Sequence, residues 1–168
     1  MAFKTVCFTG HRNIPSNDVL VLFDKLKTEI NKLYSQGYNH FSAGGAIGFD
    51  TLAALYIVEL KEKYPDIKLK IIAPFKGQGE GFCKEEREYY NKIIKSADEV
   101  EYLFENYNKG CYHVRNKALV DGADACIAYL NEATGGTFYT YNYAKKKGIE
   151  VINLGSYKEP QIKLFPEE

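Results

Sequence analysis

The chain has 168 residues, of which 45% are hydrophobic and 26% are charged, so it is long enough to bury a core and too apolar to be disordered. Its 22 basic and 22 acidic residues give a formal net charge of +0, which argues against sequence-independent binding to nucleic acid. We therefore expect one soluble domain over residues 1–168, with a C-terminal tail from about residue 155 and no nucleic-acid partner.

The first residues, MAFKTVCFTG, lack the charged and apolar regions of a signal peptide, and no apolar run approaches the roughly 20 residues that cross a bilayer. The four cysteines, Cys7, Cys83, Cys111 and Cys126, form neither a CxxC nor a CxxH pattern. We expect a cytoplasmic protein with reduced thiols, no membrane contact and no metal site. Cys7 and Cys126 lie in apolar runs, which predicts that both are buried.

Strand-like and helix-like segments alternate along the chain. In chain order, the sequence predicts a strand at 3–10, a helix at 17–37, a strand at 40–45, a helix at 49–64, a strand at 67–75, a helix at 83–97, a strand at 99–104, a helix at 112–123, a strand at 124–130, a helix at 137–148 and a strand at 150–154. The alternating tyrosines of 137–148 would also suit a strand, but the glycines before them and Gly148 after the lysines favour a helix. This order predicts an α/β fold, a Rossmann-like doubly wound and mainly parallel sheet of about six strands with helices on both faces.

The unusual residues follow the predicted strands and do not precede them. The stretch TGHR follows the first strand, AGGAIGFD the second, and NEATGGT the fifth. Doubly wound parallel sheets bind ligands beyond the carboxyl ends of their strands, where the strand order reverses. The sequence therefore predicts a ligand-binding edge of the sheet.

Two glycine-rich turns at this edge are suited to anions. In Gly44–Gly48 and Gly135–Thr137, small residues let the backbone approach a ligand, and the amides at a helix start attract negative charge. The alternatives are a tight turn at the first site, and a helix cap by Thr134 or Thr137 at the second. The glycines of KGQGEGF, at Gly77–Gly81, form either a mobile lid or a flexible connection.

Several polar side chains follow the same strands. Arg12 and Arg115 are suited to a bidentate phosphate contact, although exposed arginines are common in loops. Asp50 either accepts hydrogen bonds from ribose hydroxyls or only favours the helix start. Tyr139, Tyr141 and Tyr143, on the helix at 137–148, either stack against a base or pack.

Four stretches carry a resemblance to a known family: CFTGHR, SAGGAIGFDTLAA, YHVRNKALVDGADACIAYL and GGTFYTYNYAKKKGI. From about Phe3 to Leu154 the chain resembles the YpsA-like branch of the SLOG superfamily, which groups DNA-processing SMF proteins with LOG phosphoribohydrolases. The resemblance implies a Rossmann-like fold that binds nucleotides or nucleotide-derived ligands such as NAD, ADP-ribose or a nucleoside monophosphate. Relatives are often homodimers. The residues predicted to bind the ligand are Gly10, His11, Arg12, Gly44, Gly45, Gly48, Asp50, Arg115, Asn116, Gly135, Gly136 and Thr137.

The chain departs from the LOG enzymes at two motifs. Asn116 replaces the lysine of HxRK, and Thr140 falls where the glutamate of PGGxGTxxE would lie. An oxocarbenium-like transition state needs a carboxylate, which threonine does not supply. Asp50 or Glu132 could supply one in principle, and the catalytic candidates are Arg115 and Asp50. We expect a sensor or regulatory protein that binds a nucleotide-derived ligand. A nucleotide N-glycosidic hydrolase is the first alternative and a single-stranded DNA binding module the second, while a homodimer and an unidentified protein partner stay open.

Overall fold

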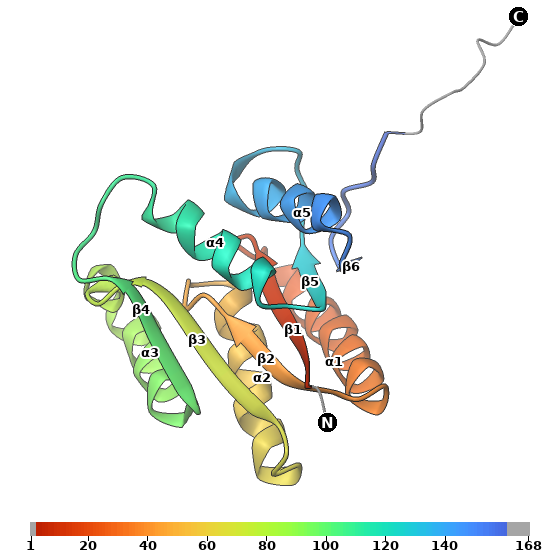
Figure 1. The fold of residues 1–168 in the computed structure, drawn as a ribbon, viewed down its shortest axis with the longest axis horizontal. Helices are drawn as coiled ribbons and strands as arrows, with labels where there is room; N and C mark the ends of the chain where they lie inside the picture. The colour runs from red at the N-terminus through yellow and green to blue at the C-terminus, as the bar shows by residue number, and fades with distance from the viewer. Residues whose placement is uncertain (1–2, 161–168) are drawn as a thin grey trace, which may run out of the picture.

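The computed structural model describes residues 3–160, and a parallel sheet of six strands lies at its centre in the order β4-β3-β2-β1-β5-β6 (Figure 1). Each pair of neighbouring strands in this sheet is parallel. The strands are β1 (Lys4–Gly10), β2 (Tyr38–Ala43), β3 (Lys68–Phe75), β4 (Glu99–Phe104), β5 (Ala125–Tyr129) and β6 (Glu150–Asn153). These bounds differ from the predicted ones by a residue or two, and the expected fold class is confirmed.

The helices form two layers, one on each face of the sheet (Figure 1). The first layer holds α1 (Val19–Ser35), α2 (Phe49–Lys63) and α3 (Lys84–Ser96). The second layer holds α4 (Cys111–Asp121) and α5 (Gly135–Lys147). Short 3-10 turns lie at η1 (Ser16–Asp18) and η2 (Gln78–Gly81). Within residues 3–160, no helix is both long and apolar enough to cross a membrane.

Side chains of β1 alternate between the two layers, as the pleat of a strand requires. Val6 and Phe8 pack into the larger core, which includes side chains of α1 and α2. Cys7 packs with Leu119 of α4, and with Cys126, its register partner on β5. Both thiols are free and fully buried, which confirms their prediction as small core residues. A strand covered on both faces explains why the centre of β1, Val6 to Phe8, is continuously apolar.

The order in which successive strands are added to the sheet reverses at β1. Strands β2, β3 and β4 extend the sheet on one side of β1, and the chain then crosses by way of α4 to β5 on the other side. At this switch point the backbone amide of His11 donates to the carbonyl oxygen of Tyr129 at 3.2 Å. The carboxyl ends of β1 and β5 are therefore joined where a Rossmann-like sheet places its ligand.

The predicted C-terminal tail is partly packed. The amide of Tyr157 donates to the carbonyl oxygen of Leu130 at 3.0 Å. The Tyr157 ring lies 5.6 Å from that of Phe138 and 5.8 Å from that of Tyr141, between ring centroids. Residues 155–160 thus cover part of α5, and residues 161–168 of the predicted tail lie outside the described residues.

Candidate functional site

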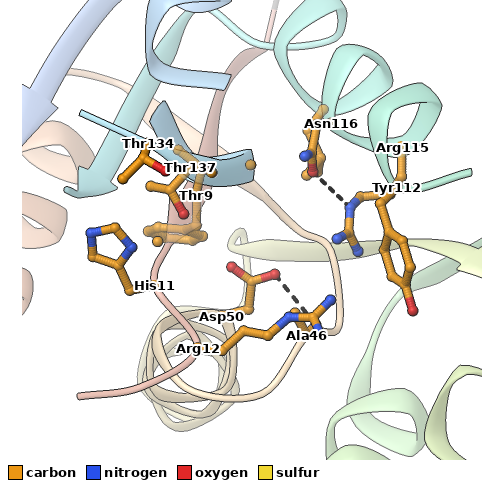
Figure 2. Close-up of a pocket in the computed structure, with 15 residues that line it drawn as sticks. Thr9, His11, Arg12, Ala46, Asp50, Tyr112, Arg115, Asn116, Thr134 and Thr137 are labelled. Atoms are coloured by element: carbon orange, nitrogen blue, oxygen red, sulfur yellow. Dashed lines mark hydrogen bonds between the residues drawn. The ribbon is translucent and has the colours of Figure 1, made fainter. Parts of the chain in front are cut away.

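A cavity of about 350 Å³ opens at the switch point (Figure 2). Its walls come from the end of β1 and from the starts of α2, α4 and α5. The residues that line it are Phe8, Thr9, Gly10, His11, Arg12, Ala46, Asp50, Tyr112, Arg115, Asn116, Leu119, Thr134, Gly135, Gly136 and Thr137.

The structure brings most of the predicted ligand-binding residues together in this cavity. The predicted residues that line it are Gly10, His11, Arg12, Asp50, Arg115, Asn116, Gly135, Gly136 and Thr137. Three predicted glycines, Gly44, Gly45 and Gly48, are not among its lining residues. The lining residues that the sequence did not single out as ligand-binding are Phe8, Thr9, Ala46, Tyr112, Leu119 and Thr134.

The glycines of the Gly44–Gly48 turn lie behind the cavity wall, to which the turn contributes Ala46. The carbonyl oxygen of Gly44 accepts hydrogen bonds from Nη1 of Arg115 and from Nε2 of Gln78, the latter at 3.2 Å. A Cβ atom on Gly44 would lie 2.5 Å from Nη1 of Arg115, so only glycine lets the guanidinium come this close. This turn therefore holds a cation in place.

The glycine-rich segment Gly77–Gly81, interpreted from the sequence as either a mobile lid or a flexible connection, lies behind the cavity wall. It forms the 3-10 turn η2, with Gln78 and Gly79 buried. Because Gln78 is bonded to Gly44, this turn is tied to the wall behind Arg115 and does not line the cavity. The contact joins residues 34 positions apart, which no local sequence pattern indicates.

Arg115 is a buried cation with fixed partners. Its side chain is 5% exposed, and its Nε donates to Oδ1 of Asn116 at 2.9 Å. Burial lowers the pKa of Arg115 below its usual value, while the nearby Asp50 carboxylate opposes this change. The guanidinium lies 5.7 Å from the ring centroid of Tyr112.

Arg12 lies over the same ring. Its guanidinium carbon is 5.2 Å from the Tyr112 centroid, and it makes no ion pair within residues 3–160. An aromatic face attracts cations, so Tyr112 helps to hold Arg12 and Arg115 near one another. Because Arg12 makes no ion pair among the described residues and lies near a second cation, Arg115, this part of the cavity favours an anionic ligand.

Asp50 is the carboxylate of the cavity, and it lies between the arginines and the β1 end in Figure 2. It lies in the first turn of α2 and is 6% exposed, and its Oδ2 accepts a hydrogen bond from the amide of Ala46 at 3.3 Å. Burial raises the pKa of Asp50, against the opposing effects of Arg115 and of the Ala46 amide. Its position suits an acceptor for hydroxyl groups of a ligand.

His11 joins the two strand ends that flank the cavity. The amide of Asn131 donates to its Nε2 at 2.8 Å, which assigns Nε2 as an acceptor and the proton to Nδ1. Burial lowers the pKa of His11, although the Glu132 carboxylate acts in the opposite direction. The imidazole is therefore neutral at pH 7, and its Nδ1 is available as a hydrogen-bond donor.

The start of α5 presents free backbone amides to the cavity. Thr134 occupies the N-cap position, but its side chain makes no capping hydrogen bond within the described chain. The hydroxyl of Thr140 donates to the carbonyl oxygen of Gly136 at 2.8 Å and is buried away from the cavity. The amides of Gly135, Gly136 and Thr137 thus have the free donors and positive dipole end that bind anions. The alternative of a helix cap is not what the structure shows.

The three tyrosines of α5, which were expected either to stack against a base or to pack, do not line the cavity. Tyr141 is buried, and its hydroxyl donates to Oε1 of Glu159 at 3.1 Å. The rings of Tyr139 and Tyr143 lie parallel to one another, with centroids 6.4 Å apart. Packing, which was the alternative, explains all three.

No group of three or more His, Cys, Asp or Glu side chains within residues 3–160 is arranged to hold a metal ion. The cavity instead combines helix amides on one side with two arginines on the other, and a carboxylate lies between them (Figure 2). The fold and this arrangement define a Rossmann-like α/β protein with a candidate ligand site at its switch point.

Comparison with known proteins identifies the family. A model of the YspA SLOG family matches residues 7–154, so the chain belongs to this family. The UPF0398 protein of Bacillus thuringiensis (strain Al Hakam) and UPF0398 protein BCAH187_A1726 of Bacillus cereus (strain AH187) are each 30% identical to it over 164 residues. Each alignment covers 92% of this chain and 89% of the relative. The resemblance seen in the sequence motifs is confirmed.

Two solved structures share the fold. DNA processing protein A (DprA) of Streptococcus pneumoniae has a TM-score of 0.65 at 16% identity, covering 96% of this chain and 52% of that protein. DNA processing protein A of Helicobacter pylori has a TM-score of 0.61 at 18% identity, covering 96% of this chain and 67% of that protein. The chain therefore spans about half the length of the Streptococcus protein. At these identities the likeness supports the fold alone.

Proposed function

We propose that the cavity binds a nucleotide or a nucleotide-derived ligand such as NAD, ADP-ribose or a nucleoside monophosphate. The observation that carries this proposal is the presence of two separate anion-binding features in one cavity of about 350 Å³, namely the uncapped start of α5 and the pair Arg12 and Arg115. Small-molecule sites typically enclose roughly 300–1,000 Å³. In this proposal a phosphate accepts hydrogen bonds from Gly136 and Thr137, and Asp50 accepts them from ribose hydroxyls.

We further propose that the chain acts as a sensor or regulatory protein in the cytoplasm. The hydrolase alternative needs a carboxylate beside the sugar, and Thr140 is buried with its hydroxyl bonded inside α5. Asp50 is the one carboxylate among the lining residues described, so it is the residue that a hydrolase of this fold would use. Release of free base from AMP by the wild-type protein, but not by Asp50→Asn, would favour the enzyme. A homodimer stays a prediction.

Gly136→Asp is expected to abolish ligand binding without loss of fold. A Cβ at this position has its nearest neighbour, Nδ2 of Asn116, at 3.7 Å, and a carboxylate in the first turn of a helix is favourable. The same carboxylate would repel a phosphate and occupy its amide donors, so affinity should fall by roughly 100-fold or more. Thermal unfolding with NAD, ADP-ribose, AMP or ATP measures this, because a ligand at 100 times its Kd adds about 2.7 kcal/mol.

Asn142→Asp is the matched control. It adds the same charge to the same helix at an exposed position that does not line the cavity, so binding should be unchanged. A ligand that stabilises the wild type and Gly136→Asp equally would contradict the assignment of the α5 start as the phosphate site. If no nucleotide stabilises the wild type, the proposed function is wrong.

Single-stranded DNA is the second candidate ligand. The Helicobacter protein has a single-stranded DNA binding mode, which weighs against our expectation that nucleic acid is not a partner here. The free cation Arg12 at the cavity could contact a DNA phosphate as well as that of a small ligand. Zero net charge favours the small ligand. Fluorescence polarisation with a labelled oligo(dT) at 50 and 200 mM salt should show no binding, and strong salt-dependent binding would favour DNA.

A further inference from the structure

Three aromatic side chains gather where β3, the β4–α4 loop and α4 meet. They are Phe75 at the end of β3, Tyr107 in the loop, and Tyr112 in the first turn of α4. The centroid of Phe75 lies 5.8 Å from that of Tyr107 and 6.3 Å from that of Tyr112, and the two tyrosine centroids are 6.2 Å apart. We call these residues the aromatic cluster.

The aromatic cluster adjoins the cavity through Tyr112, whereas Phe75 and Tyr107 are not among the lining residues. Tyr112 lines the cavity and carries the guanidiniums of Arg12 and Arg115 near its ring. Phe75 meets both tyrosines at 79°, and the tyrosines are tilted by 52° to one another, so none of the three rings covers another face to face. Edge-to-face and tilted contacts are the usual packing of aromatic rings, and here they leave the ring faces uncovered by one another.

Tyr107 is the exposed residue of the aromatic cluster. It is 62% exposed, and no cation lies over its ring within the part of the chain that the structure describes. A tyrosine that is supported by two rings and still exposes its own is suited to stack against a planar aromatic group.

We propose that the aromatic cluster is the nucleobase subsite of the cavity, with Tyr107 as its stacking surface. Figure 2 shows Tyr112 and Arg115 on the side opposite Thr134 and Thr137, with Asp50 between them. A nucleotide has the same order of parts, a phosphate, a ribose with hydroxyl groups, and a flat base. The cavity and the adjoining aromatic cluster together therefore offer a suitable protein group for each part. This inference rests on the proposed function.

Isothermal titration calorimetry with AMP and ribose 5-phosphate tests the subsite, because the two probes differ only in the base. Tyr107→Ala should weaken AMP binding between about 5-fold and 150-fold, the range of base–aromatic stacking, and should leave ribose 5-phosphate within about twofold. Tyr107→Phe keeps the ring and should bind AMP like the wild type. Tyr89→Ala is the control, since Tyr89 is a 43% exposed tyrosine of α3 that does not line the cavity.

The outcomes separate the subsite from the proposed function. If AMP binds no more tightly than ribose 5-phosphate, or if Tyr107→Ala weakens both probes equally, the nucleobase subsite is overturned and the phosphate site stands. If the wild type binds neither probe nor an oligo(dT), the nucleobase subsite is overturned, and the proposed function is overturned as well if NAD, ADP-ribose and ATP also fail to stabilise the protein. Binding of oligo(dT) but not of AMP, with the same dependence on Tyr107, would support the subsite and assign its base to single-stranded DNA.

Discussion

Gly48→Ala is expected to destabilise the protein by roughly 2–5 kcal/mol, the combined cost of a left-handed backbone for alanine and of overpacking. Gly48 has a φ of +79°, and a Cβ atom there would lie 2.1 Å from the carbonyl oxygen of Arg12. That oxygen cannot move away freely, because the adjacent His11 carbonyl accepts a hydrogen bond from the amide of Phe49 at 3.2 Å. The substitution would therefore strain the junction of β1 and α2.

Urea unfolding followed by circular dichroism measures the effect, with Gly81→Ala as the control. A Cβ atom on Gly81 would meet no heavy atom within 4 Å, and the φ of Gly81 is not positive, so this change should stay within about 0.5 kcal/mol. Similar stabilities for the two variants would contradict the close packing of Gly48 against Arg12. Because Arg12 lines the cavity, Gly48→Ala should also weaken ligand binding.

Local sequence patterns were sufficient to predict the fold. The helix stripe Leu22, Leu26, Ile30 and Leu33 is buried, as its spacing indicates. The continuous apolar run at β3 is buried on both faces, as a central parallel strand must be. Gly148 ends α5 in the left-handed conformation, which explains why the lysine-rich segment before it is a helix and not a strand.

The site was predictable where its residues follow a strand or lie in the first turns of the next helix, as Asp50 and Arg115 do. His11 and Arg12 leave β1, and the Gly135–Thr137 turn comes soon after β5, so topology alone places them at one edge. The role of Gly44 could not be predicted, since its partner Arg115 is 71 positions away. The contacts of Tyr107 could not be predicted from the nearby sequence either, because its ring packs against Phe75 and Tyr112, which belong to other elements.

Asp50→Asn is expected to raise the stability of the unliganded protein at pH 7. Burial raises the pKa of Asp50 in the folded state, so the folded protein holds this proton to a higher pH than the unfolded chain does. The free energy of unfolding therefore falls as the pH rises from 3.8, the usual pKa of an aspartate, to the pKa of Asp50 in the folded protein. Above that pKa the loss of stability is complete. Asparagine keeps an acceptor for the Ala46 amide without the charge. The gain of the variant should shrink as the pH falls toward 3.8.

Arg115→Met should have the opposite effect, with a loss of about 3 kcal/mol at pH 7, because it leaves the buried Asp50 carboxylate without its nearby cation. Adding Asp50→Asn should restore part of this loss. Urea unfolding of the wild type, both single variants and the double variant forms a cycle that measures the coupling. Additivity within about 0.5 kcal/mol would show that the two side chains act independently. Coupling, together with weaker nucleotide binding by Asp50→Asn, would mean that a carboxylate which destabilises the empty cavity is retained for its ligand.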